Sequence, residues 1–172
     1  PAFSNGKVIF GTTEGIFGWV LINILNFIVS WALGDPIESS PAISEGTIYI
    51  GTLSGKVFAL NQTNAEIIWQ QDIGYECALS PALAYDTLFV EVLDPHPKAY
   101  LYALDRANGN VKWSFNYTRS FGFPRWWQQV SLTSPSVSNG KVYTGADGFF
   151  CLNATSGEII WQNTTTYVWS SP

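Results

Sequence analysis

The chain has 172 residues, of which 47% are hydrophobic and 12% are charged, so it can bury a core and is not a disordered segment. Its formal charge of −5 provides no basic surface for phosphate groups, and we therefore do not expect nucleic acid as a partner. Aromatic residues make up 16% of the chain, a composition that favours β-sheets.

The first unit of the chain, residues 1–40, holds a long uncharged stretch. Ile16 to Leu33 is 18 residues without a charge, which reaches the lower limit for a membrane-spanning helix. Asn23 and Asn26 lie at its centre, no basic segment follows, and the stretch keeps the phase of the later units. We therefore expect strands and no membrane span here, with a span or signal anchor as the alternative.

The second unit, residues 41–80, shows an internal repeat. The sequence that runs from Ser39 (SSPAISEGTIYIGTLSGKVFALNQTNAEIIWQ) matches the sequence that runs from Thr133 (TSPSVSNGKVYTGADGFFCLNATSGEIIWQ). Within the unit, apolar residues alternate with a period of two, and Gly, Asn or Asp residues separate the runs. Each unit is therefore predicted to be a four-stranded antiparallel meander. Because one such sheet cannot bury both faces alone, radial stacking into a β-propeller is expected.

The third unit, residues 81–134, carries two insertions, at Leu93–Lys98 and in the link Ser114–Ser134. The link contains arginine and aromatic side chains of the kind found in recognition surfaces: Arg119, Phe121, Phe123, Arg125, Trp126 and Trp127. We interpret them as a docking surface for a protein or sugar, the alternative being that they cover the end of the sheet's core.

Two single residues of the third unit stand out. His96 is the only histidine, so the chain can form neither a Ser-His-Asp triad nor a histidine-rich metal site. Glu91 occupies a position that is glycine in the other units, and we expect it to face solvent.

The fourth unit covers residues 135–171, and Pro172 opens another. The prolines that begin successive units are Pro1, Pro41, Pro81, Pro135 and Pro172. From this phase we expect the four units to be part of a larger ring, completed by remaining blades of the same chain or by a second copy. Cys77 and Cys151 are interpreted as two buried thiols, with a disulfide as the alternative.

The corner between the third and fourth strands recurs as ALNQTNAEIIW (59–69), ALDRANGNVKW (103–113) and CLNATSGEIIW (151–161). These segments resemble the tryptophan-docking motif AxDxxTGxxxW of pyrroloquinoline-quinone (PQQ) type propellers. The resemblance implies an eight-bladed all-β propeller, of which this chain is half, and a tryptophan from each blade lying against the next. The residues assigned this structural role are Trp31, Trp69, Trp113 and Trp161. Phe27 replaces the glycine in the first unit, so its hairpin is expected to differ.

The same resemblance implies two functions. Quinoprotein alcohol dehydrogenases hold PQQ and calcium at the ring centre, whereas other relatives, among them outer-membrane assembly lipoproteins, are non-catalytic. We expect a non-catalytic scaffold for protein interactions, with no catalytic, cofactor or metal residue in these units. The alternative is a fragment of a PQQ-dependent dehydrogenase with PQQ and calcium.

Four asparagines stand in glycosylation acceptor sequences: Asn61, Asn116, Asn153 and Asn163. All lie on predicted turns or strand ends, and lysine is scarce. We therefore predict a glycoprotein located outside the cell or in the cell envelope. For Asn61 and Asn153, capping of a turn by the side chain is an additional explanation.

Overall fold

A computed structural model describes residues 2–4, 7–14, 16–21, 28–74, 76–77, 79–93, 98–118, 133–145 and 148–164. Within these residues all regular structure is β-strand, arranged as four four-stranded antiparallel sheets. The prediction of an all-β fold built from four consecutive meanders is therefore confirmed.

Each sheet takes its strands in chain order. The first sheet contains β1 (Ala2–Ser4), β2 (Lys7–Gly11), β3 (Ile16–Leu21) and β4 (Ile28–Ala32). The second contains β5 (Ala42–Ser44), β6 (Thr47–Gly51), β7 (Lys56–Asn61) and β8 (Ile67–Asp72). The third contains β9 (Ala82–Ala84), β10 (Thr87–Leu93), β11 (Lys98–Asp105) and β12 (Val111–Thr118). The fourth contains β13 (Ser136–Ser138), β14 (Lys141–Gly145), β15 (Phe149–Asn153) and β16 (Ile159–Asn163).

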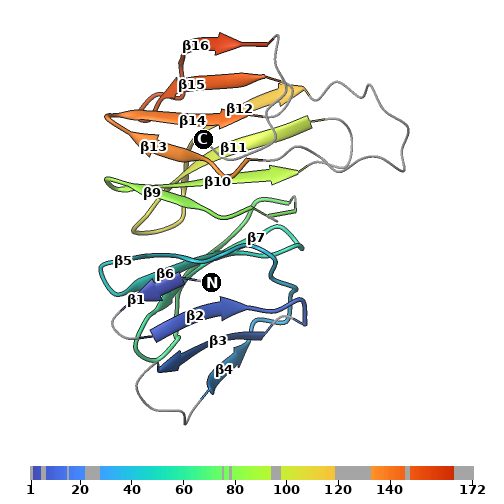
Figure 1. Cartoon of the computed structure of the whole chain (residues 1–172), viewed down its shortest axis with the longest axis vertical. Coiled ribbons are helices and arrows are strands. Elements are labelled where there is room, and N and C mark those ends of the chain that lie inside the picture. The colour runs from blue at the N-terminus through green and yellow to red at the C-terminus, as the bar shows by residue number, and fades with distance from the viewer. Residues whose placement is uncertain are drawn as a thin grey trace, which may run out of the picture.

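The four sheets lie in a row, with the first sheet at one end and the fourth at the other (Figure 1). The first strands of successive sheets contact one another, β1 with β5, β5 with β9 and β9 with β13. A chain of serines ties the links together, because Ser40 N donates to Ser80 Oγ (3.0 Å) and Ser80 N donates to Ser134 Oγ (3.2 Å). The backbone N–H of one link serine therefore donates to the side chain of the equivalent serine in the next link, so the same contact repeats from unit to unit.

The turns between first and second strands follow the sequence signals. Asn139 and Gly140 have φ of 48° and 72°, and Glu45 and Gly46 have φ of 50° and 75°. Two consecutive residues with positive φ make the tight hairpin whose twist matches that of the flanking strands. The hairpin predicted from Asn139-Gly140 is confirmed.

The first sheet departs from the expected alignment of Trp31. In the second sheet Ala59 pairs with Trp69. By register, Trp19 of the first sheet corresponds to Ala59, and it pairs with Val29. Trp31 instead pairs with Phe17, two positions further along β4. The alignment of Trp31 with the other tryptophans therefore differs from the strand register, and its docking role stays a prediction. The segment between β3 and β4 contains Asn23 and Asn26 but no glycine, so it lacks the turn glycine found in the third and fourth units. These residues lie outside the described part of the chain.

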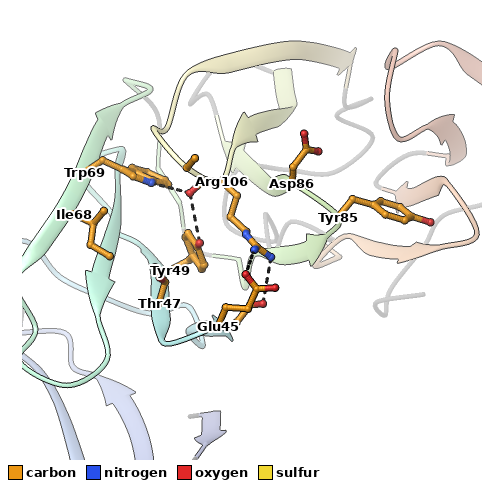
Figure 2. Close-up of a pocket in the computed structure, with 10 residues that line it drawn as sticks. Glu45, Thr47, Tyr49, Ile68, Trp69, Tyr85, Asp86 and Arg106 are labelled. Atoms are coloured by element: carbon orange, nitrogen blue, oxygen red, sulfur yellow. Dashed lines mark hydrogen bonds and ion pairs between the residues drawn. The ribbon is translucent and has the colours of Figure 1, made fainter.

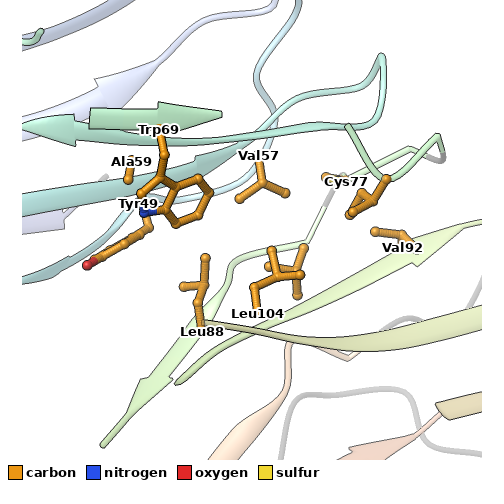
Figure 3. Packing of buried hydrophobic residues seen from close by; sticks show 10 residues of the cluster. Tyr49, Val57, Ala59, Trp69, Cys77, Leu88, Val92 and Leu104 are labelled. Carbon is orange, nitrogen blue, oxygen red and sulfur yellow. The ribbon is translucent and has the colours of Figure 1, made fainter. Parts of the chain in front are cut away.

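The core lies between neighbouring sheets. Between the second and third sheets, Val57 and Trp69 from one side meet Leu88, Val92 and Leu104 from the other, all of them buried (Figure 3). Burial of a large aliphatic or aromatic side chain contributes about 1.5–3 kcal/mol. The sheets are thus held together by apolar contacts that no single unit could form.

The uncharged stretch of the first unit forms β3 and β4 in its described parts. Nowhere among the residues that the structure describes does a helix reach the length and apolar character needed to cross a membrane.

Both cysteines are free and buried, so the expectation of two buried thiols is confirmed. Burial raises the pKa of the Cys77 thiol to about 12. Because the thiolate is the reactive form, Cys77 is expected to stay unmodified by a thiol reagent at pH 8 in the folded protein. Two thiols per chain should react after unfolding in denaturant. Rapid reaction of Cys77 before unfolding, measured by mass spectrometry of the labelled peptide, would contradict its burial.

Candidate functional site

Two tryptophans join neighbouring sheets in the same way. Trp69 on β8 donates its Nε1–H to the carbonyl of Arg106 (3.0 Å), and a Cβ added to Gly109 would lie 2.6 Å from its ring. Trp113 on β12 donates to the carbonyl of Ala154 (3.2 Å), and a Cβ on Gly157 would lie 2.7 Å from its ring. Each indole thus packs flat against a glycine of the next sheet, where a side chain would not fit.

Trp161 occupies the equivalent position on β16 but is 42% exposed. The ring centroids of Trp161 and Tyr143 are 6.3 Å apart, and those of Trp69 and Tyr49 are 6.0 Å apart. The expectation that Trp161 is largely buried was wrong for this structure, because no described sheet follows the fourth one to cover it (Figure 1).

A cavity of about 360 Å³ opens between the second and third sheets, beside Trp69. It is formed by the turns before β6 and before β10, by the turn after β11 and by β8 (Figure 2). The side chains that line it are Ser44, Glu45, Thr47, Tyr49, Ile68, Trp69, Tyr85, Asp86, Arg106 and Ala107.

Arg106 is the central polar residue of this cavity (Figure 2). Its guanidinium donates to Ser44 Oγ (3.3 Å) and pairs with Glu45 Oε2 (2.5 Å), both on the second sheet. Its carbonyl accepts hydrogen bonds from Trp69 Nε1–H and, at 3.5 Å, from the Tyr49 hydroxyl. Burial raises the pKa of the Tyr49 phenol. Arg106 therefore joins the third unit to the second through both its side chain and its backbone carbonyl.

On the other side of Arg106 lie Asp86 and Tyr85 (Figure 2). Asp86 pairs with Lys112 (2.9 Å), and the hydrogen bond from Lys112 holds the pKa of Asp86 below its usual range. Tyr85 has a φ of 55° and a ring that is 68% exposed. An aromatic ring thus stands in solvent at the edge of a polar cavity.

At the next interface, between the third and fourth sheets, the repeat places other residues at four of these positions. When the repeats are aligned, the residues of the next interface that correspond to Tyr49, Ile68, Tyr85 and Arg106 are Phe89, Lys112, Asn139 and Ala154, in that order. Lys112 pairs with Asp86 and also approaches Asp105 at 3.6 Å, both of them in its own unit. The set of cavity residues between the second and third sheets is therefore a local departure from the repeat. The signal for this departure in the sequence is Arg106, at a position occupied by Gln62 and Ala154 in the neighbouring units.

Glu91 contradicts its expected exposure, because its side chain on β10 is completely buried. Its Oε2 accepts a hydrogen bond from Thr144 Oγ1 at 2.6 Å, across the interface between the third and fourth sheets. Thr144 is also fully buried and stands where the second sheet has Ile50. Relative to the second sheet, Glu91 replaces a glycine and Thr144 replaces an isoleucine. The hydrogen bond between them offsets part of the cost of burying two polar side chains.

The predicted docking surface of arginine and aromatic residues, from Arg119 to Trp127, lies outside the described residues. Of the four candidate glycosylation sites, Asn116 on β12 and Asn163 on β16 are exposed. The side chains of Asn61 and Asn153 are half-buried and accept hydrogen bonds from the backbone of their own turns. Turn capping by these two residues is confirmed.

The first strands of the four sheets contact one another and are called the inner strands here. Their residues are compared with what PQQ and calcium, the cofactors implied by the resemblance, would need. The described first strands read AFS, AIS, ALA and SVS and supply neither a cation nor a carboxylate. PQQ is a tricarboxylate and calcium prefers oxygen ligands that include carboxylates. In the part of the chain that the structure describes, no three His, Cys, Asp or Glu side chains gather as a metal site would need. The described first strands therefore offer no charged group to PQQ or calcium, and the expectation that these units hold no cofactor stays a prediction.

Comparison with known proteins identifies the repeats. A family model described as "Outer membrane protein assembly factor BamB" matches residues 25–123 and 98–170. An uncharacterized protein of Rickettsia conorii is 26% identical over 78% of this chain and 34% of its own length. The quinoprotein alcohol dehydrogenase PedH of Pseudomonas putida is 27% identical over 74% of this chain and 23% of its own length. The chain thus spans about a third or less of these curated relatives.

Among solved structures, BamB from Moraxella catarrhalis superimposes with a TM-score of 0.78 and 17% identity, over 93% of this chain and 46% of that protein. At this identity the likeness concerns the fold, which is a β-propeller.

Proposed function

Since the chain belongs to the family of PQQ-repeat propellers described by BamB, we propose that it is a non-catalytic scaffold that binds protein partners in the cell envelope or outside the cell. The observation that carries the proposal is an apolar row on the outer strands. Ile67 on β8, Val111 on β12 and Ile159 on β16 stand at one repeat position and are 53%, 47% and 47% exposed. Ile68 and Ile160 beside them are also about half exposed.

Such a row favours contact with another protein for two reasons. Half-exposed aliphatic side chains recur at equivalent positions of three successive sheets, which distinguishes them from single apolar residues scattered over a surface. They also lie on strands at the edge of each sheet, where unpaired backbone groups can meet another chain. Partners include remaining blades of the same protein, a second copy and a different envelope protein.

A photo-activated cross-linking residue placed at Ile67 or Ile159 tests the scaffold role in cells that naturally make the protein. Discrete adducts with the same protein partner are expected from both positions. The same residue at Glu14, on an exposed turn of the first sheet, is the control and should give no such adduct. Absence of adducts at both outer-strand positions, or an identical pattern from Glu14, would contradict the proposal.

The second candidate function, a fragment of a PQQ-dependent dehydrogenase, is favoured by the likeness to PedH. It is tested by adding PQQ and calcium to the purified protein and measuring alcohol-dependent reduction of a dye. We expect no activity above that of the untreated protein, because the inner strands supply no charged group. Activity that needs both additions would establish the enzyme and remove the scaffold proposal.

An envelope or extracellular location is supported by the exposed acceptor asparagines Asn116 and Asn163. We expect a glycan on at least one of the four candidate asparagines of protein isolated from its natural source. Intact-mass measurement before and after enzymatic deglycosylation is the test. A mass equal to that of the bare polypeptide would remove this support for the location.

A further inference from the structure

We infer that the cavity between the second and third sheets binds a neutral, hydroxyl-rich ligand, a carbohydrate of one or two sugar rings. This inference concerns a different ligand from that of the scaffold role, and its cavity lies among the turns beside Trp69, sharing only Ile68 with the apolar row of the outer strands. It follows from the pairing of the charged side chains in the cavity, from its hydrogen-bonding groups and from the exposed ring at its edge (Figure 2).

Each charged side chain that lines the cavity already has an oppositely charged partner. Glu45 pairs with Arg106, and Asp86 pairs with Lys112 behind it. An anionic ligand would meet two carboxylates, whereas a cationic one would compete with the arginine and the lysine for them. A neutral ligand disturbs neither pair, so electrostatics favour it over both kinds of ion.

The same pairs retain hydrogen-bonding capacity. The side chain of Arg106 uses two of its five N–H groups in its contacts with Ser44 and Glu45. Glu45 is 76% exposed and contacts Arg106 through one of its two carboxylate oxygens. A sugar hydroxyl can accept from the guanidinium and donate to the carboxylate at once, which matches this mixture of donors and acceptors.

The apolar part of the cavity suits a sugar ring. Tyr85 exposes 68% of its surface at the edge, and Ile68 exposes 52% on the opposite side (Figure 2). The C–H face of a pyranose packs on such flat apolar surfaces while its hydroxyls point sideways to polar groups. A volume of about 360 Å³ lies at the small end of ligand sites, which limits the ligand to one or two rings.

The repeat supplies matched substitutions for the test. Tyr85→Asn and Arg106→Ala introduce the residues that the fourth sheet carries at the same positions, Asn139 and Ala154. Asn139 has a φ of 48°, so Asn fits the backbone conformation of Tyr85. Ile68→Lys introduces the counterpart of Lys112, which should fill the cavity entrance. Val111→Ala, on an exposed residue outside the cavity, is the control.

The experiment is ligand-observed NMR with the full chain and three neutral disaccharides, cellobiose, maltose and N,N′-diacetylchitobiose. Glucuronate and glucosamine serve as anionic and cationic probes. At least one neutral disaccharide is expected to bind, and Tyr85→Asn and Arg106→Ala should each weaken it about tenfold. Ile68→Lys should abolish binding, and Val111→Ala should leave it unchanged.

Three results would overturn the inference: no binding of any neutral disaccharide, equal binding by the Tyr85→Asn and Arg106→Ala variants, or tighter binding of a charged probe. Tighter binding of a charged probe would instead favour an ionic ligand or a charged side chain of a protein partner. Thermal unfolding of each variant shows whether it is folded, and Ile68→Lys provides a second reading if Arg106→Ala loses stability.

Discussion

Replacing Trp69 by alanine is expected to lower the free energy of unfolding by about 3–5 kcal/mol, the range for removal of a large core side chain. The ring is only 8% exposed and packs in the cluster between the second and third sheets. The substitution also leaves the carbonyl of Arg106 without the indole N–H that it accepts at 3.0 Å. Denaturant titration followed by circular dichroism measures the loss.

Trp161→Ala is the matched control, because this tryptophan has the same place in its unit but is 42% exposed. In the 172-residue chain it should cost much less than Trp69→Ala, since less apolar surface is buried. Equal losses for the two variants would show that burial against the next sheet is not the source of the stabilisation.

A pair of glycines tests the same interface from its other side. Gly109 and Gly140 have φ of 78° and 72°, so alanine is strained at both. Only at Gly109 would the new Cβ meet a neighbour, 2.6 Å from the Trp69 ring, whereas nothing lies within 4 Å at Gly140. Gly109→Ala should therefore cost about 1–3 kcal/mol more than Gly140→Ala. Similar losses would mean that the indole does not lie on this glycine.

Thr144→Val is expected to lower the free energy of unfolding by about 1–3 kcal/mol or more, although the two side chains have nearly the same shape. The reason is Glu91, whose carboxyl group is fully buried and accepts the Thr144 hydroxyl at 2.6 Å. Removing the donor takes one hydrogen bond from a buried acceptor, and this leaves part of its desolvation cost uncompensated.

A double-mutant cycle separates this contact from other effects. In a Glu91→Gly background, which introduces the residue found at this position in the other units, Thr144→Val should cost little or nothing. If Thr144→Val costs the same with and without the glutamate, the hydrogen bond between the sheets contributes nothing to stability.

The fold could be predicted from the sequence because its determinants are local and repeated. Alternating apolar residues, turn residues such as Asn139-Gly140 and the tryptophan spacing recur in phase, so each unit supports the interpretation of the others. The first unit was misaligned at Trp31 because the segment before it, with Asn23 and Asn26 among apolar residues and no glycine, does not fix the position of its turn. There the strand pairing, with Phe17 opposite Trp31, determines the register.

The site could not be predicted in the same way, because it depends on departures from the repeat. Glu91 was expected at the surface on the general ground that charged residues are rarely buried. Its partner Thr144 is 53 positions away, and only the packing of two sheets brings them together. Arg106 likewise acts through Ser44 and Glu45 of the preceding sheet, contacts that sequence spacing does not reveal.

The placement of the tryptophan and the turn glycine has a consequence for how such a protein can grow. The second unit presents Trp69 to the unit that follows, and the third presents Gly109 to the unit that precedes it and Trp113 to its successor. A gene segment encoding one unit therefore carries both halves of the joint, one at each side. Tandem duplication of that segment would create a new junction that already fits, whereas a single codon change at Gly109 or Gly157 would spoil one. Adding whole units thus keeps every junction between sheets intact, whereas changing one of these glycines disrupts a junction.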